Sequence, residues 1–214
     1  MSLITVPAVE GEPVLRIATP EDRAAIDALM AESAAAHFPR FYAEPECSSA
    51  VRYIAAVDPM LLEDGTYYVF EADRGIVACG GWSRRGKLYT GSGDADDDAR
   101  MIDPATEPAR VRAMFVRDDW SRRGLGRRIL EACEAAARRE GFSELALMST
   151  MPGLPLYLSY GFERLDDVAI PLPDGLTVAG ATMSKPIDAD RVHQPDVPGS
   201  PLNGPTMSDV IQPP

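Results

Sequence analysis

The chain has 214 residues, a formal net charge of -12 and 45% hydrophobic residues, which predicts one soluble globular domain with a sizeable core. The acidic balance argues against general nucleic-acid binding. No apolar run approaches the roughly 20 residues of a membrane helix, and the first residues lack the charge and apolar core of a signal peptide. We therefore expect a cytoplasmic protein that binds neither a membrane nor nucleic acid.

The cysteines Cys47, Cys79 and Cys133 are odd in number, widely spaced and accompanied by only two histidines. This pattern predicts neither a disulfide framework nor a zinc site. We interpret each cysteine as a small apolar residue and expect no metal.

The first part of the expected domain, residues 14–185, follows a polar leader of residues 1–13. Val14 to Ala18 is predicted to form a short strand. Thr19-Pro20-Glu21-Asp22 is typical of a helix start, with a capping hydroxyl and a proline at the first helical position. This helix should end near Ala36, and a second helix is expected from Ser48 to Val57. Residues recurring at intervals of three and four predict the buried face of the first helix: Ala25, Ile26, Leu29, Met30 and Ser33.

Two apolar runs within TYYVFEADRGIVACGGWS flank Asp73-Arg74-Gly75 and predict an antiparallel hairpin. Gly80 and Gly81 inside the second run indicate a bulge or a close backbone approach. Residues 84–108 should form a long loop, either an active-site lid or a mobile insertion. As a lid, this loop would offer a tyrosine and several aspartates to a cationic substrate: Tyr89, Asp94, Asp96, Asp97 and Asp98.

A strand, a basic turn and a long helix follow one another between Arg110 and Glu140. The strand is Arg110 to Val116, and the helix should end before Gly141. Its predicted apolar stripe consists of Ile129, Leu130, Cys133, Ala136 and Ala137. Five arginines within twelve residues create a local positive potential in an acidic protein and indicate an anionic ligand: Arg117, Arg122, Arg123, Arg127 and Arg128.

The rest of the domain is predicted as a short buried strand, a short helix and a hairpin. The strand is Glu144 to Ser149, and MPGLPLYLSYGF supplies a helix that ends at Gly161. Two runs, Phe162 to Leu172 and Leu176 to Lys185, form the closing hairpin. Residues 186–214 are rich in proline and are expected to form a disordered or loosely docked tail. His193 lies in this tail, so we do not expect it to be catalytic.

The turn from Ser121 to Arg128 has the features of an anion site at a helix N-terminus. Gly124 and Gly126 remove side chains where the backbone turns, so that amide N–H groups can line a concavity. The helix dipole alone contributes only about 0.3 to 1 kcal/mol, so the arginines must supply much of the affinity. A dinucleotide fingerprint would need a third glycine where Ile129 stands, and the Gly-Lys-Ser/Thr of a P-loop is absent. A purely structural turn stays open as the alternative.

The order strand, basic Gly-x-Gly turn, helix, strand and short helix resembles the GNAT superfamily of acyl-CoA-dependent N-acyltransferases. The family's pyrophosphate loop, Gln/Arg-x-x-Gly-x-Gly/Ala, is matched by Ser121 to Gly126 except at its first position. A tyrosine four residues before Gly-Phe is matched by Tyr157. The resemblance covers about Val14 to Lys185 and implies a mixed α/β (α+β) fold, with a twisted sheet of six or seven strands flanked by about four helices.

The resemblance also implies acetyl-CoA as co-substrate and assigns residues to it. Met114, Phe115 and Val116 would align the pantetheine arm and polarise the thioester carbonyl. Thr150 stands where many members have an asparagine that touches this arm. Ser121 replaces the usual Gln or Arg, so a neighbouring arginine would take over its contact. The pyrophosphate would be held by Arg122, Arg123, Gly124, Leu125, Gly126 and Arg127.

By the same resemblance, Tyr157 would donate its hydroxyl to the leaving sulfur, with Tyr160 as the rival. A tyrosine pKa near 10 lies about 1.5 units above that of a thiol near 8.5, so Tyr157 should act mainly as a hydrogen-bond donor. An acceptor ammonium must lose a proton before attack, which requires a base. The strand Arg110 to Val116 carries no carboxylate for this role. The open candidates are Glu71, Asp118, Asp119, Glu144 and a bound water.

We therefore expect an N-acetyltransferase that moves acetyl from acetyl-CoA to a primary amine of a small molecule or peptide, by direct attack in a ternary complex. A non-catalytic acyl-CoA-binding sensor is the alternative, because the carboxylate that some relatives carry is missing. A homodimer is compatible with the sequence, which identifies neither the acceptor nor the oligomeric state.

Overall fold

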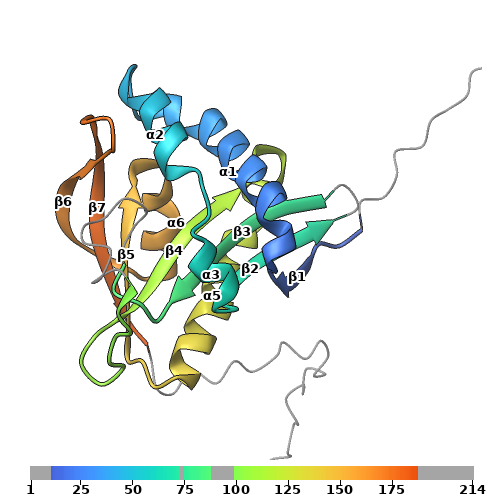
Figure 1. Ribbon diagram of the computed structural model, residues 1–214, viewed down its shortest axis with the longest axis vertical. Helices are drawn as coiled ribbons and strands as arrows, with labels where there is room; N and C mark the ends of the chain where they lie inside the picture. Colours follow the sequence, from blue (N-terminus) through green and yellow to red (C-terminus); the bar gives the residue numbers. More distant parts are fainter. Residues whose placement is uncertain (1–10, 73–74, 88–98, 188–214) are drawn as a thin grey trace, which may run out of the picture.

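Seven strands form one mixed sheet in the computed structural model, which describes residues 11–72, 75–87 and 99–187 (Figure 1). Their order is β1-β2-β3-β4-β5-β7-β6. All neighbours pair antiparallel except β4 and β5, which pair in parallel. The mixed sheet predicted from the sequence is confirmed. The bounds are β1 Val14–Ile17, β2 Tyr67–Ala72, β3 Gly75–Ser83, β4 Ala109–Val116, β5 Glu144–Thr150, β6 Glu163–Pro171 and β7 Thr177–Pro186.

Helices cover both faces of the sheet (Figure 1). The first three pack on one face: α1 Arg23–His37, α2 Glu46–Ile54 and α3 Pro59–Glu63. The last two pack on the other: α5 Leu125–Arg139 and α6 Leu154–Tyr160. Short 3-10 turns lie at Pro20–Asp22 (η1), Phe38–Arg40 (η2), Asp118–Trp120 (η3) and Met151–Gly153 (η4).

The alternation of side chains along β2 divides the core into two clusters. Tyr67 and Val69 point toward the cluster that contains α1, whereas Phe70 points toward the cluster that contains α5. Successive strand residues face opposite sides of a sheet, so one strand can serve both cores. The α5 face is built around Ile129, Leu130 and Cys133, and the α1 face around Ile26, Leu29 and Met30.

Several local expectations are confirmed and a few are wrong. Both hairpins form, and all three cysteines are buried thiols without a disulfide. Ala25 is exposed, because the buried stripe of α1 runs from Ile26 to Ala34 and leaves position 25 at its edge. The second helix ends at Ile54 rather than Val57, because Ala55 leaves the helical region of backbone angles.

Helix α3 is not anticipated by the sequence reasoning. It begins after Asp58, whose side chain accepts a hydrogen bond from the Met60 N–H, and Pro59 occupies its first turn. Aspartate followed by proline is a start signal that could have revealed it. The helix has only five residues, too few to show a 3.6-residue repeat.

Three sequence-based expectations fall partly outside the described residues. These are the leader up to residue 10, the tail from residue 188, which includes His193, and the loop residues 88–98, which include Tyr89 and the aspartates proposed as lid contacts. The domain limits therefore stay a prediction. Within the described ranges, no helix is long and apolar enough to cross a membrane, and no group of three or more potential metal ligands occurs.

Candidate active site

A cleft opens where β4 and β5 separate. The two strands pair only at Ala109 with Leu145 and at Arg110 with Ala146. Beyond these pairs β4 continues to Val116 alongside β3, while β5 continues to Thr150 alongside β7. Backbone groups between the diverging strands are therefore released from the sheet ladder and can serve a ligand.

A bulge on β4 lies at the mouth of this split. Arg112 pairs with Gly81 and Phe115 with Cys79, so β4 has one residue more than β3 between the two pairs. Ala113 at the bulge has φ of 52°. A left-handed conformation costs a non-glycine residue about 1 to 2 kcal/mol, so surrounding contacts must hold it. The bulge or close approach expected at Gly80 and Gly81 is confirmed.

The basic turn has the backbone of an anion site. Arg122 and Gly124 both adopt left-handed conformations, with φ of 64° and 82°, and α5 begins at Leu125 directly after them. Left-handed residues beside a helix start turn consecutive amide N–H groups inward, toward a negative group. At Gly126 a side chain would meet Leu156 of α6, with 3.0 Å between the new Cβ and Leu156 Cδ2. The turn and the start of α6 thus stand close together.

The two features border one cleft of about 720 Å³. Its floor includes Met114, Phe115 and Val116, one wall comes from the end of α1 and η2, and the other from η4 and α6. All residues that the resemblance assigns to acetyl-CoA or to catalysis line this cleft except Arg123. The Arg123 guanidinium instead lies over the Trp120 ring, 4.5 Å from its centroid.

Tyr157 and Tyr160 on α6 differ in what their hydroxyls contact. Tyr157 lines the cleft, is only 8% exposed, and its ring packs edge-on against Phe162. Burial raises its pKa well above the ordinary value. The Tyr160 hydroxyl donates to Glu134 on α5 over 2.8 Å and is not part of the cleft lining. The geometry therefore favours Tyr157 over Tyr160 for a role in the cleft.

Of the four carboxylates considered as bases, only Asp118 lines the cleft. Glu71 is bound to Arg16, and Asp119 to Arg117. Glu144 stands at the start of β5, next to the closed end of the split. The side chain beside Asp118 is His37, with 3.6 Å between Nε2 and Oδ1.

His37 is a cleft residue that the sequence reasoning missed. It ends α1 one turn after Ser33, whose hydroxyl donates to the Val116 carbonyl over 2.8 Å. The spacing of four residues from a buried serine indicated the same helix face. Nothing in the local pattern indicated that this end of the helix borders β4.

A family model of the GNAT acetyltransferase domain matches residues 63–164. The matched stretch contains the β4 bulge, the basic turn, α5 and Tyr157. This match supports a member of the GNAT superfamily. No protein with a curated description matches the sequence.

Solved structures similar to this chain share its fold at low identity. A GCN5-related N-acetyltransferase from Rhodopseudomonas palustris has a TM-score of 0.62 and 18% identity, over 83% of this chain and 98% of that one. The PaiA N-acetyltransferase of Thermoplasma acidophilum, in complex with coenzyme A, has a TM-score of 0.57 and 16% identity, over 82% and 99%. YncA from Salmonella typhimurium, with acetyl-CoA, has a TM-score of 0.53 and 17% identity, over 83% and 95%.

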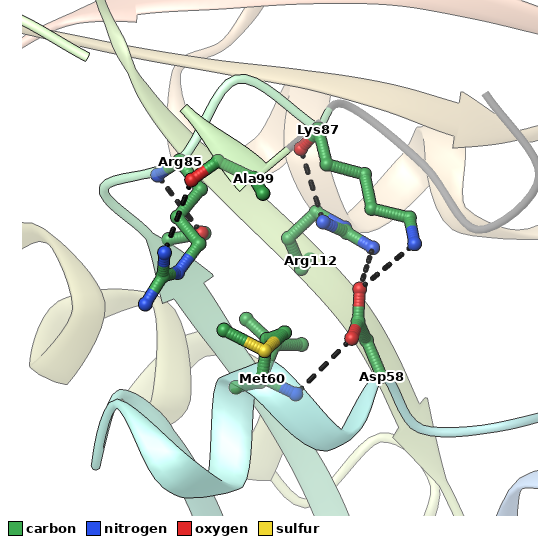
Figure 2. A pocket seen from close by; sticks show the side chains of 8 residues that line it. Asp58, Met60, Arg85, Lys87, Ala99 and Arg112 are labelled. Atoms are coloured by element: carbon green, nitrogen blue, oxygen red, sulfur yellow. Dashed lines mark hydrogen bonds and ion pairs between the residues drawn. The ribbon is translucent and has the colours of Figure 1, made fainter. Parts of the chain in front are cut away.

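A second, smaller cavity of about 180 Å³ lies beside α3, on the face of the sheet that α1 covers (Figure 2). The buried Arg112 guanidinium donates to the Lys87 carbonyl and lies 3.4 Å from Asp58 Oδ2. The Lys87 ammonium is 3.1 Å from the same oxygen. Burial alone would raise the pKa of Asp58, but the Lys87 hydrogen bond and the nearby positive charges outweigh it and lower this pKa. This ionic cluster fixes β4 one residue before the bulge.

Proposed function

We propose that this protein transfers acetyl from acetyl-CoA to a primary amine of a small molecule or peptide, by direct attack in a ternary complex. One observation carries the proposal: a single cleft joins the left-handed turn at Arg122 and Gly124, the bulged strand β4, and the buried Tyr157. The turn suits a pyrophosphate, and the bulged strand suits the extended pantetheine arm with its thioester carbonyl. The Tyr157 hydroxyl suits a leaving thiolate.

The residues present suit acetyl-CoA as a co-substrate. The N–H groups of the turn and the start of α5 offer donors to a pyrophosphate, with Arg122 and Arg127 at the cleft edge. The apolar side chains of Met114 and Leu156 line the middle of the cleft, where a pantetheine arm would run between β4 and α6. Thr150 closes the floor at the end of β5.

In the proposed reaction, the amine nitrogen attacks the thioester carbonyl carbon, the new C–N bond forms and the C–S bond breaks. The thiolate accepts a hydrogen bond from Tyr157, whose raised pKa keeps the hydroxyl protonated and makes it a hydrogen-bond donor rather than an acid. The ammonium loses one proton to solvent or to a base before the attack. The nitrogen loses a second proton as the amide forms, which balances the proton that the thiolate takes up. The candidate carboxylate base that lines the cleft is Asp118, which lies next to His37.

The test is thiol release from acetyl-CoA in the presence of a panel of amines, with mass detection of the acetylated product. We expect amine-dependent turnover by the wild type and a drop in kcat of about tenfold or more in Tyr157→Phe, typical of a lost acid or donor. Tyr160→Phe, on the same helix, should retain kcat. Coenzyme A binding by calorimetry should be similar in all three proteins.

Tight coenzyme A binding without turnover for any amine would contradict the proposal and support a non-catalytic acyl-CoA sensor. Turnover that Tyr157→Phe leaves unchanged would keep the transferase and remove Tyr157 from its mechanism.

A further inference from the structure

The Tyr67 side chain connects β2 to β4 across the intervening strand. Tyr67 is completely buried, and its hydroxyl donates to the Ala113 carbonyl over 2.6 Å. Ala113 is the left-handed residue of the bulge. Because β3 lies between β2 and β4 in the sheet, the ring must pass over β3 to make this bond.

Gly81 on β3 makes this crossing possible. A Cβ at position 81 would stand 2.6 Å from Tyr67 Cδ2 and 2.5 Å from the Thr66 carbonyl oxygen. Real Cβ atoms do not approach other atoms so closely, so any side chain at position 81 would displace the tyrosine. The neighbouring Gly80 faces the other side of the sheet, where a Cβ would collide with the Met114 sulfur. Gly81 thus makes room for Tyr67 on one face of the sheet, and Gly80 makes room for Met114 on the other.

The hydrogen bond from Tyr67 orients the whole peptide group between Ala113 and Met114, not only its carbonyl. A peptide group is planar and trans, so the Ala113 carbonyl and the Met114 N–H point in opposite directions within one rigid unit. Fixing the carbonyl oxygen toward Tyr67 therefore fixes the Met114 amide, and Met114 lines the cleft. The hydroxyl also lies 4.0 Å from the Met30 sulfur, so α1 packs against the same contact.

We propose that Tyr67 is a positioning residue for acyl transfer. It holds the β4 bulge in its left-handed conformation and thereby sets the direction of the backbone amide of Met114 in the acyl-CoA cleft. This role rests on the proposed function. Tyr67 itself is fully buried beneath the bulge, so it acts through the backbone.

The test compares Tyr67→Phe with Tyr68→Phe. The first variant removes only the hydroxyl and keeps the ring over Gly81. The second is a matched control, because Tyr68 is the next residue of β2 and packs in the cluster on the opposite face of the sheet. Both are measured for kcat with acetyl-CoA, for the Kd of coenzyme A, and for hydrogen–deuterium exchange of the segment Arg110 to Val116.

In Tyr67→Phe we expect kcat to fall about fivefold or more, because small misplacements of groups at a reacting centre are costly. The Kd of coenzyme A should stay within about twofold, since the turn at Arg122 to Gly126 supplies most of the predicted phosphate contacts. Exchange in Arg110 to Val116 should accelerate, and Tyr68→Phe should show neither effect. Lower stability would reduce only the amount of folded enzyme. Therefore kcat is calculated per coenzyme A-binding site, and a loss of stability alone would not lower it.

A kcat within about twofold of wild type, or an equal fall in both variants, would overturn the proposal. If the wild type itself shows no turnover, the proposed function fails. Hydrogen–deuterium exchange then tests separately whether the Tyr67 hydroxyl holds the bulge. Unchanged exchange in Arg110 to Val116 of Tyr67→Phe would then show that the hydroxyl does not hold the bulge, whereas faster exchange would show that it does.

Discussion

The Tyr160 hydroxyl donates to Glu134 Oε2 over 2.8 Å, and the Lys185 ammonium donates to the same oxygen over 3.0 Å. Arg138 binds the other carboxylate oxygen over 3.2 Å. One buried carboxylate therefore joins α5, α6 and β7, directly behind the helix that carries Tyr157.

Replacing Glu134 by glutamine should destabilise the protein by about 3 kcal/mol, because it leaves the buried Lys185 without its counter-charge. Urea unfolding measures the effect. Glu131→Gln is the control on the same helix, since the exposed pair of Glu131 with Arg127 should contribute under about 1 kcal/mol. Equal losses in the two variants would argue against the buried pair as a stabilising unit.

The substitution Gly124→Ala changes the backbone conformation of the turn and leaves its arginines in place, so it tests the conformation alone. Gly124 and Gly65 both have positive φ and open space where a Cβ would stand, so alanine introduces backbone strain of about 1 to 2 kcal/mol at either site. Both variants should lose similar stability in thermal unfolding. Only Gly124→Ala should weaken coenzyme A binding in calorimetry, and equal coenzyme A affinity in both would exclude a phosphate-binding role for the turn.

Arg122 and Arg123 are adjacent but should have different roles. Arg122 lines the cleft, so Arg122→Ala should weaken coenzyme A binding about tenfold, the loss expected for a charge-assisted hydrogen bond. Arg123→Ala should cost about 0.5 to 1 kcal/mol of stability through its contact with Trp120 and change the Kd little. A titration at two salt concentrations checks the assignment, because only the Arg122 contribution should weaken with added salt.

The pH dependence of kcat should have no alkaline fall from Tyr157. Burial raises the pKa of this hydroxyl, so it remains a donor at pH values where an ordinary tyrosine, with a pKa near 10, begins to ionise. Activity should therefore keep rising toward about pH 10 as the acceptor ammonium, with an ordinary pKa near 10.4, loses its proton, and it should not fall in this range. A fall in kcat below pH 10 that is absent from Tyr157→Phe would contradict the raised pKa.

The strand, turn and helix between Arg110 and Glu140 could be predicted because their signals are local. The apolar stripe of α5 repeats within single turns, and the glycines mark where the chain must bend. The two hairpins were predictable for the same reason. The grouping of the cleft residues came from the family resemblance, and the structure brings nearly all of them together without testing their roles.

The features that escaped prediction depend on distant contacts. His37 reaches the cleft because α1 packs along the end of β4, and the Tyr67 ring reaches β4 only because Gly81 of the intervening strand lets it pass. Arg112, in an apolar strand, is tolerated because Asp58 and Lys87 meet it from separate segments. A single-sequence pattern does not report which segments become neighbours.

The separation of β4 from β5 also has a mechanical consequence. Only two residue pairs join the half of the sheet formed by β1 to β4 to the half formed by β5 to β7. We expect the two halves to bend about this short seam, with α5 as the stiff element beside it. A ligand that contacts both strands across the split would restrain this bending. Bound coenzyme A should therefore slow the relative motion of the two halves, including in strands that it does not contact.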